Sequence, residues 1–187
     1  GKPINYSKIA RDMGADDKTV RTYFEILQDT YLGYRLPAFH RSTRKRLQEA
    51  SKFYFFDLGV KRALDRTLRV EMVRGTYAYG DAFECWVIQE AFRLNEYFKR
   101  DFKLSYLRTY GGAEIDLVVE RPGEPDLLVE IKSTSRIQES DLRHLVSFRD
   151  SWDRPCEAQA WSLDPLSKKI DGISCLPWQE GLKAFSA

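Results

Sequence analysis

One segment, residues 111–132 (GGAEIDLVVERPGEPDLLVEIK), constrains the fold most, because it places charged residues inside two short apolar runs separated by a Pro/Gly turn. Apolar runs of this length around such a turn predict two neighbouring strands. Asp116 opens the first run, and Glu130 and Lys132 close the second. Because strand side chains alternate between faces, Glu130 and Lys132 are expected to point to one face of the sheet.

The acids and the lysine of this segment suggest a site for a divalent cation. Mg²⁺ prefers oxygen ligands and keeps several waters, one of which can attack a phosphodiester. Asp116 and Glu130 would supply carboxylate ligands, and Lys132 would supply positive charge beside them. The spacing D-x(13)-E-x-K is not specific by itself, because a surface hairpin with a structural Glu130–Lys132 ion pair would match it equally.

The amino-acid composition limits the classes of protein to which the chain can belong. A content of 43% hydrophobic and 13% aromatic residues in 187 residues is enough for a buried core. The chain has neither an apolar run near the length of a membrane span nor a leader, so a cytoplasmic protein is expected, and its start without Met predicts an excised piece. The three cysteines are widely spaced and odd in number, which predicts reduced thiols. His40 and His144 lack partners at zinc-ligand spacing and are expected to be ordinary surface or core residues.

Charge is divided unevenly along the chain. Residues 1–79 hold 16 Lys and Arg against 9 Asp and Glu, whereas residues 80–187 hold 14 against 19. The first part is therefore suited electrostatically to phosphate backbones, although two domains with different solvated surfaces would show the same asymmetry. A mixed connector around Gly75 predicts a domain boundary between residues 1–74 and residues 75–187.

The first domain is predicted to be a winged helix, that is, a helix-turn-helix followed by a two-stranded ribbon with a basic tip. Asn5 and Gly14 bracket a first short helix. Asp16 or Asp17 caps a second helix, whose expected apolar stripe consists of Val20, Tyr23, Phe24, Leu27 and Tyr31. Two strands and a closing helix are expected at residues 32–36, 52–56 and 57–65.

DNA contact is one interpretation of this domain. The residues expected to touch DNA are, on the second helix, Lys18, Arg21 and Thr22 and, at the tip of the wing, Arg44, Lys45 and Arg46. Carboxylates crowd the same helix and would face the phosphates. Winged helices also serve as protein-interaction modules, so both interpretations stay open.

The second domain is predicted to be a mixed α/β (α+β) unit. Its expected elements, in addition to the two central strands, are helices at residues 80–98, 141–150 and 177–185 and strands at residues 104–110, 158–162 and 170–175. Glu84 lies at the edge of the apolar stripe of the long helix. A carboxylate in that place is either a paired acid at the rim of the core or a ligand.

The order of Glu84 on a helix, Asp116 on a strand and Glu130-x-Lys132 on the next strand resembles the PD-(D/E)xK nuclease superfamily. The resemblance implies a restriction-endonuclease-like fold, with a helix, a three-stranded meander, a further helix and a further strand. It implies that Asp116 and Glu130 are ligands of Mg²⁺ or Mn²⁺ and that Glu84 is an accessory ligand. Lys132 would orient the attacking water. Ile115 stands where many members have proline, and residues 140–150 hold no clear counterpart of the Gln or Tyr that some members carry.

Nearly the whole chain is similar to the C-terminal region of a family of bacterial and archaeal AAA-type ATPases, which carries a winged helix and a nuclease-like module. The matching segments are INYSKIARDMG, KTVRTYFEILQDTYLGYRLPAF, KFYFFDLGVKRAL, GDAFECWVIQE, GGAEIDLVVE and LLVEIKSTSRI. No G-x-x-x-x-G-K-[ST] motif occurs, so no ATP site is expected. The partners implied are DNA, the N-terminal ATPase domain of a longer protein and further copies of the chain, but no membrane.

Two functional hypotheses follow from the sequence. In the first, the chain is a Mg²⁺-dependent DNA nuclease module attached to an AAA-type ATPase. In the second, the same module has no catalytic activity and recruits nucleic acid or a partner protein to that ATPase.

Overall fold

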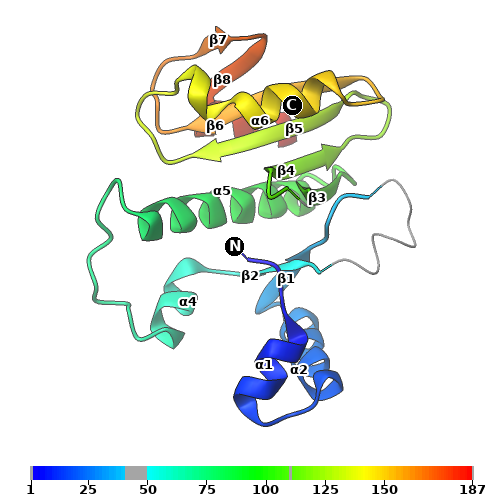
Figure 1. Ribbon diagram of the computed structural model, residues 1–187, viewed down its shortest axis with the longest axis vertical. Coiled ribbons are helices and arrows are strands. Elements are labelled where there is room, and N and C mark those ends of the chain that lie inside the picture. Colours follow the sequence, from blue (N-terminus) through cyan, green and yellow to red (C-terminus); the bar gives the residue numbers. More distant parts are fainter. Residues whose placement is uncertain (1, 41–49, 110, 187) are drawn as a thin grey trace. The chain divides into compact units, whose positions relative to one another are not determined.

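The computed structural model describes residues 2–40, 50–109 and 111–186, which form a mixed α+β structure with helices and two sheets. The chain divides into two compact units, Gly1–Val70 and Glu71–Ala187. Each unit has its own sheet (Figure 1). The proposed wing residues Arg44, Lys45 and Arg46 lie outside the described residues.

The first unit begins with two helices that start and end where the sequence predicts. In α1 (Tyr6–Met13), the Asn5 side chain accepts a hydrogen bond from the Lys8 amide at 2.9 Å, and Gly14 ends the helix with a φ of 67°. In α2 (Asp17–Asp29), Asp16 takes the capping position and accepts from the Thr19 amide at 2.8 Å. The capping residues therefore determine both helix starts.

The rest of the first unit is a two-stranded antiparallel ribbon and a closing helix, formed by β1 (Gly33–Leu36), β2 (Lys52–Phe55) and α4 (Leu58–Leu64). The ring of Phe24 on α2 packs edge-on against Phe53 of β2, with 5.0 Å between the centroids. The predicted stripe on α2 is wrong at Tyr23 and Tyr31, which are 50% and 87% exposed. The ribbon is too short to cover the whole helix, so the stripe that it buries is narrower than the pattern of apolar residues.

The second unit is built on a six-stranded sheet in the order β3-β4-β5-β6-β8-β7 (Figure 1). The strands are β3 (Lys103–Arg108), β4 (Glu114–Glu120), β5 (Asp126–Lys132), β6 (Cys156–Ser162), β7 (Lys168–Ile170) and β8 (Ile173–Pro177). The pairs β5–β6 and β6–β8 are parallel, and the other pairs are antiparallel. The predicted single strand at 170–175 is wrong, because Asp171 and Gly172 both adopt positive φ and turn the chain into the β7–β8 hairpin.

Helices cover this sheet. They are α5 (Tyr77–Tyr97), η1 (Glu139–Asp141), α6 (Arg143–Asp150), α7 (Trp178–Leu182) and η2 (Lys183–Phe185). The long helix α5 packs against β5 and α7. Helix α6 packs against β4, β5 and β6 (Figure 1). Helix α5 starts at Tyr77, a turn earlier than predicted, because the Thr76 hydroxyl accepts a hydrogen bond from the Tyr79 amide and caps the helix there.

The register of β5 and β6 decides which face of the sheet each charged residue meets. Ile131 pairs with Trp161, and the Trp161 indole lies directly under α7, since a Cβ added at Gly181 would meet its ring nitrogen at 2.3 Å. Neighbours in a parallel pair share a face. Ile131 therefore points to the α7 face, and Glu130 and Lys132 point to the opposite one.

Two further expectations concern thiols and membranes. Cys85, Cys156 and Cys175 form no disulfide in the described structure, in line with the reduced thiols that the sequence predicts. Over the described ranges, the protein has no helix with both the length and the apolar character needed to cross a membrane.

Candidate functional site

The candidate site lies where strands β4 and β5 separate. Over the described residues their pairing runs from Val119–Leu127 to Leu117–Val129, and it ends one residue before Asp116 and Glu130. Beyond that point the Asp116 carboxylate takes the place of the missing backbone partner, because its Oδ2 accepts a hydrogen bond from the Ile131 amide at 2.7 Å. Both acidic side chains are buried there, with exposed fractions of 9% for Asp116 and 7% for Glu130.

A β-bulge aims Asp116 into this gap. On the other side of β4, Ser105 pairs with Val118 and Leu107 pairs with Ile115, so that Tyr106 alone faces two residues, Asp116 and Leu117. Bulges of this kind redirect a side chain and are frequent beside functional sites. The bulge and the strand split together explain why a carboxylate is 9% exposed within a central strand.

Glu130 and Lys132 form an ion pair on β5. The Lys132 Nζ lies 2.5 Å from the Glu130 Oε1. The Glu130 residue is only 7% exposed, and its other oxygen, Oε2, is buried without a hydrogen-bond partner in the described structure. The structural ion pair that the sequence allowed is therefore present, but on a buried face beside Asp116 and not on an exposed hairpin.

Three more residues interact electrostatically with this cluster. Glu84, half-buried on α5, repels the carboxylates of Asp116 and Glu130 electrostatically. Asp141 of η1 acts on Lys132, and His144 of α6 acts on Glu130. Sequence reasoning included Glu84 but missed Asp141 and assigned His144 no role; the signal available was their place in the first helical turns after the strand that carries Lys132.

Burial dominates the ionisation of the site. Burial, followed by the charges of Glu130 and Glu84, raises the pKa of Asp116 well above its ordinary value. Burial also raises the pKa of Glu130, even though Lys132 acts in the opposite direction. Burial lowers the pKa of Lys132, but the nearby carboxylates, Glu130 first, outweigh it, so its pKa is raised. Lys132 therefore stays charged, while the ionised forms of Asp116 and Glu130 are disfavoured.

The fit of this cluster to a divalent ion rests on two carboxylates. Glu130 Oε2 is a buried acceptor without a donor, and Asp116 lies beside it with a raised pKa. Both features suit an added cation, since Mg²⁺ and Mn²⁺ take oxygen ligands. Within residues 2–40, 50–109 and 111–186, however, no three His, Cys, Asp or Glu side chains are grouped so as to hold a metal ion. Glu84 is thus near the two acids without completing a three-carboxylate group.

The raised pKa of Asp116 leads to a stability prediction. A folded-state pKa above the unfolded value means that the native state binds the extra proton, so stability falls as pH rises through the window between the two pKa values. Above that window the ionised side chain destabilises the fold. Asp116→Asn keeps an oxygen for the Ile131 amide and removes the charge. We expect it to raise the free energy of unfolding at pH 7.5, without metal, by more than the roughly 0.5 kcal/mol typical of surface changes.

The matched control is Asp126→Asn in a urea titration of both variants. Asp126 is equally buried on β5, but its Oδ2 accepts from the Trp152 indole at 2.9 Å and pairs with Arg154 at 2.9 Å. Removal of that charge should lower stability. A decrease of similar size in both variants would contradict the description of Asp116 as an uncompensated buried acid.

The residues expected to contact DNA on α2 are all exposed. Lys18, Arg21 and Thr22 lie at the surface of the first unit. The Arg21 guanidinium stacks over the Tyr6 ring, 4.2 Å from its centroid, which holds that cation against α1. Tyr23 and Ile26 are each 50% exposed on the same helix, so its accessible surface is apolar as well as charged.

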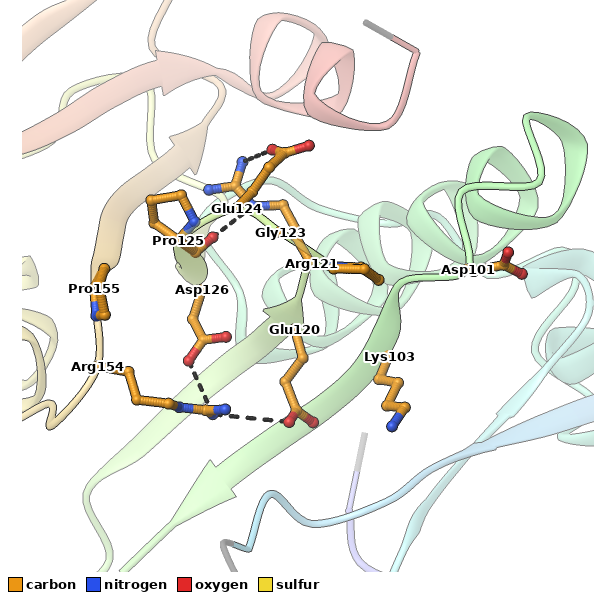
Figure 2. A pocket seen from close by; sticks show the side chains of 11 residues that line it. Asp101, Lys103, Glu120, Arg121, Gly123, Glu124, Pro125, Asp126, Arg154 and Pro155 are labelled. Carbon is orange, nitrogen blue, oxygen red and sulfur yellow. Dashed lines mark hydrogen bonds and ion pairs between the residues drawn. The ribbon is translucent and has the colours of Figure 1, made fainter.

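A cavity of about 540 Å³ lies at the other end of β4 and β5 (Figure 2). The β4–β5 turn, the start of β3 and the segment before β6 line it, and Arg154 bridges Glu120 and Asp126 at its edge, with nitrogen–oxygen distances of 3.7 and 2.9 Å. Its lining includes none of the predicted site residues. Its charged side chains largely neutralise one another, so the carboxylate cluster remains the better candidate for chemistry.

Comparison with known proteins gives two family matches and one structural similarity. Residues 1–71 match the model of a domain of unknown function, DUF8612. No curated protein matches the chain. One similar solved structure is a refined half-complex from the tetradecameric assembly of Thermococcus gammatolerans McrB AAA+ hexamers with bound McrC, at 13% identity and a TM-score of 0.38. The similarity covers 84% of this chain and about 60% of the matched chain, and a TM-score this low does not establish a shared fold.

The second family match concerns the unit that holds the carboxylate cluster. Residues 79–171 match the model of another domain of unknown function, DUF4143. Glu84, Asp116, Glu130 and Lys132 all fall within this range. The candidate site therefore lies in the segment that is similar to the DUF4143 family.

Proposed function

We propose that the second unit is a metal-dependent phosphodiesterase of the PD-(D/E)xK nuclease type, with Asp116, Glu130 and Lys132 as its catalytic residues. One observation carries the proposal: two buried carboxylates with raised pKa values lie on neighbouring strands where the strand pairing ends, and one of them has an oxygen without a partner. Folding does not favour such an arrangement, because burying an uncompensated charge is costly. Groups perturbed in this way are concentrated at functional sites.

Asp116 and Glu130 would hold Mg²⁺ or Mn²⁺, with Glu84 as an accessory ligand after a change of its side-chain rotamer. When bound, the ion would supply an activated water and positive charge for a phosphodiester. Asp116 is already oriented for this role by the Ile131 amide. Burial contributes most to the raised pKa of Asp116, and a bound cation would offset the carboxylate repulsion that adds to it.

Lys132 would stabilise negative charge on the phosphate rather than act as a base. Its pKa is raised by the neighbouring carboxylates, against the effect of burial, so the ammonium group keeps its proton at neutral pH. Its Nζ is now held by Glu130 at 2.5 Å. If Glu130 held a metal ion, Lys132 would be free to stabilise charge that develops on the phosphate oxygens.

The first unit would bind nucleic acid. We propose that it is a winged helix whose α2 residues Lys18, Arg21 and Thr22, together with the wing residues Arg44, Lys45 and Arg46, contact the DNA backbone. The excess of positive charge in residues 1–79 and the exposure of the α2 residues support this role. The resemblance to ATPase C-terminal regions supports attachment of the whole module to an AAA-type ATPase.

A non-catalytic module is the second candidate. It is favoured by the absence of a three-ligand metal group among the described residues and by the neutralisation of Glu130 by Lys132. The exposed apolar residues Tyr23, Ile26 and Tyr31 of the first unit also suit a protein partner better than DNA. In this alternative the carboxylate cluster would be present but would catalyse no reaction.

The test of the first candidate is cleavage of supercoiled plasmid and of a labelled single-stranded oligonucleotide by the wild-type chain. We expect nicks or shortened products with Mg²⁺ or Mn²⁺ and none in EDTA, since the buried acids need a cation to act. Substrate that stays intact in every divalent ion would favour the non-catalytic module.

A further inference from the structure

The loop at residues 133–137, which directly follows Lys132, is tied down by contacts that do not belong to the carboxylate cluster. Thr134 closes the loop internally, because its hydroxyl accepts from the Arg136 amide at 3.2 Å and donates to the Arg136 carbonyl at 3.1 Å. The Leu163 amide donates to the Thr134 carbonyl at 3.1 Å and joins the loop to the segment after β6. The loop thus has a defined shape.

Asp164 is the main anchor of this loop. It is 5% exposed, and its Oδ2 accepts from the Ile137 amide at 3.2 Å and from the Lys168 Nζ at 2.7 Å. Its Oδ1 accepts from the Leu166 amide at 3.1 Å. One carboxylate therefore joins the end of the loop to the β6–β7 connection.

The same anchor is connected to the strand that carries the catalytic lysine. Lys132 pairs with Ser162 across β5 and β6, and the Ser162 hydroxyl accepts from the Asp164 amide at 3.1 Å. On the other side of the loop, a Cβ added at Gly80 of α5 would lie 3.4 Å from the Ser133 hydroxyl. Gly80 is one helical turn before Glu84, so the loop is held between the ends of β5 and β6 and the α5 helix at the site.

The side chains that the loop presents are polar and accessible. Ser135 and Arg136 are exposed, and the described residues offer the Arg136 side chain no ion pair. An exposed cation four residues after Lys132 is suited to the phosphate groups of a nucleic-acid chain, which the carboxylate cluster itself would repel in the absence of metal.

We propose that Asp164 is a positioning residue for substrate: it fixes loop 133–137 so that Arg136 contacts a backbone phosphate of the nucleic acid beside Lys132. The inference rests on the proposed function and adds to it a phosphate contact and the residue that sets it. Asp164 itself touches no substrate, so its effect must pass through Arg136.

The experiment measures binding of a fluorescein-labelled single-stranded DNA oligonucleotide to the full chain by anisotropy, in EDTA so that no cleavage occurs. Arg136→Ala should weaken binding about tenfold and lower the slope of log K against log salt by about 0.7, the value for one phosphate contact on a single strand. In Asp164→Asn one of the two acceptor oxygens becomes an amide donor, so the side chain can no longer accept from both the Ile137 and the Leu166 amides, which loosens the loop. This variant should cause a similar loss, and the double variant should lose no more than either single variant.

The controls separate loop placement from general damage. Glu180→Gln breaks an exposed ion pair with Lys183 on the C-terminal helices and should bind as the wild type does. Should Asp164→Asn fail to fold, Thr134→Val removes the hydrogen bonds inside the loop and is expected to show the same non-additivity with Arg136→Ala. Additive losses, or an unchanged salt slope, would overturn the role of Asp164. A wild-type chain that binds no oligonucleotide would overturn this inference, whereas the cleavage assay with divalent ions tests the proposed function separately.

Discussion

A Lys132→Met variant is expected to lose phosphodiester cleavage by about 10²–10³-fold, the usual cost of removing one group that stabilises charge in a transition state. The methionine fills a similar volume but carries no charge. It also leaves Glu130 without the cation that now lies 2.5 Å from it. Divalent-ion affinity should therefore be kept or increased, because the ion no longer competes with the ammonium group for the carboxylate.

Two measurements on the same preparations make this result decisive. The cleavage rate of the labelled oligonucleotide is followed with Mn²⁺, and ion binding is followed by calorimetry. Lys183→Met is the matched control, because Lys183 forms an exposed ion pair with Glu180 outside the site. Equal cleavage by wild type, Lys132→Met and Lys183→Met would show that the activity comes from a contaminating nuclease.

The second large effect is expected for Glu130→Gln, which should weaken Mn²⁺ binding by about 100-fold or more. Mutation of residues that only hydrogen-bond to metal ligands already lowers metal affinity by about 10–100-fold, and Glu130 would be a ligand itself. The amide keeps the shape of the side chain but removes the charge on the buried Oε2. Asp116→Ala should behave in the same way. Asp126→Asn, a buried β5 carboxylate at the opposite end of the strand, should bind the ion as the wild type does.

The contrary result is equally informative. If calorimetry detects no ion in the wild type, and Glu130→Gln changes nothing, the carboxylates are a structural cluster and the module acts by binding alone. Oligonucleotide binding in EDTA would then decide whether its partner is nucleic acid.

Much of the fold could be predicted because local signals determine it. The caps at Asn5 and Asp16 and the stop at Gly14 act within one helical turn, and the sequence contains them in full. The hairpin between Asp116 and Lys132 could be predicted for the same reason, since the turn and both apolar runs are contiguous.

The features that make the site could not be predicted, because they depend on partners distant in the sequence. The bulge at Asp116 exists only through the register of β3, and the strand split exists only where β5 continues along β6. The approach of Asp141 and His144 depends on how α6 returns over the sheet. On α2, the apolar pattern could not show that the ribbon leaves Tyr23 exposed.

The most direct test of the central claim is the anomalous diffraction of crystals soaked in Mn²⁺. We expect one peak between Asp116 and Glu130, within coordination distance of an oxygen of each, with the Lys132 Nζ displaced from Glu130. Crystals that show no peak there, with Lys132 still paired to Glu130, would contradict the assignment of this cluster as a metal-dependent site.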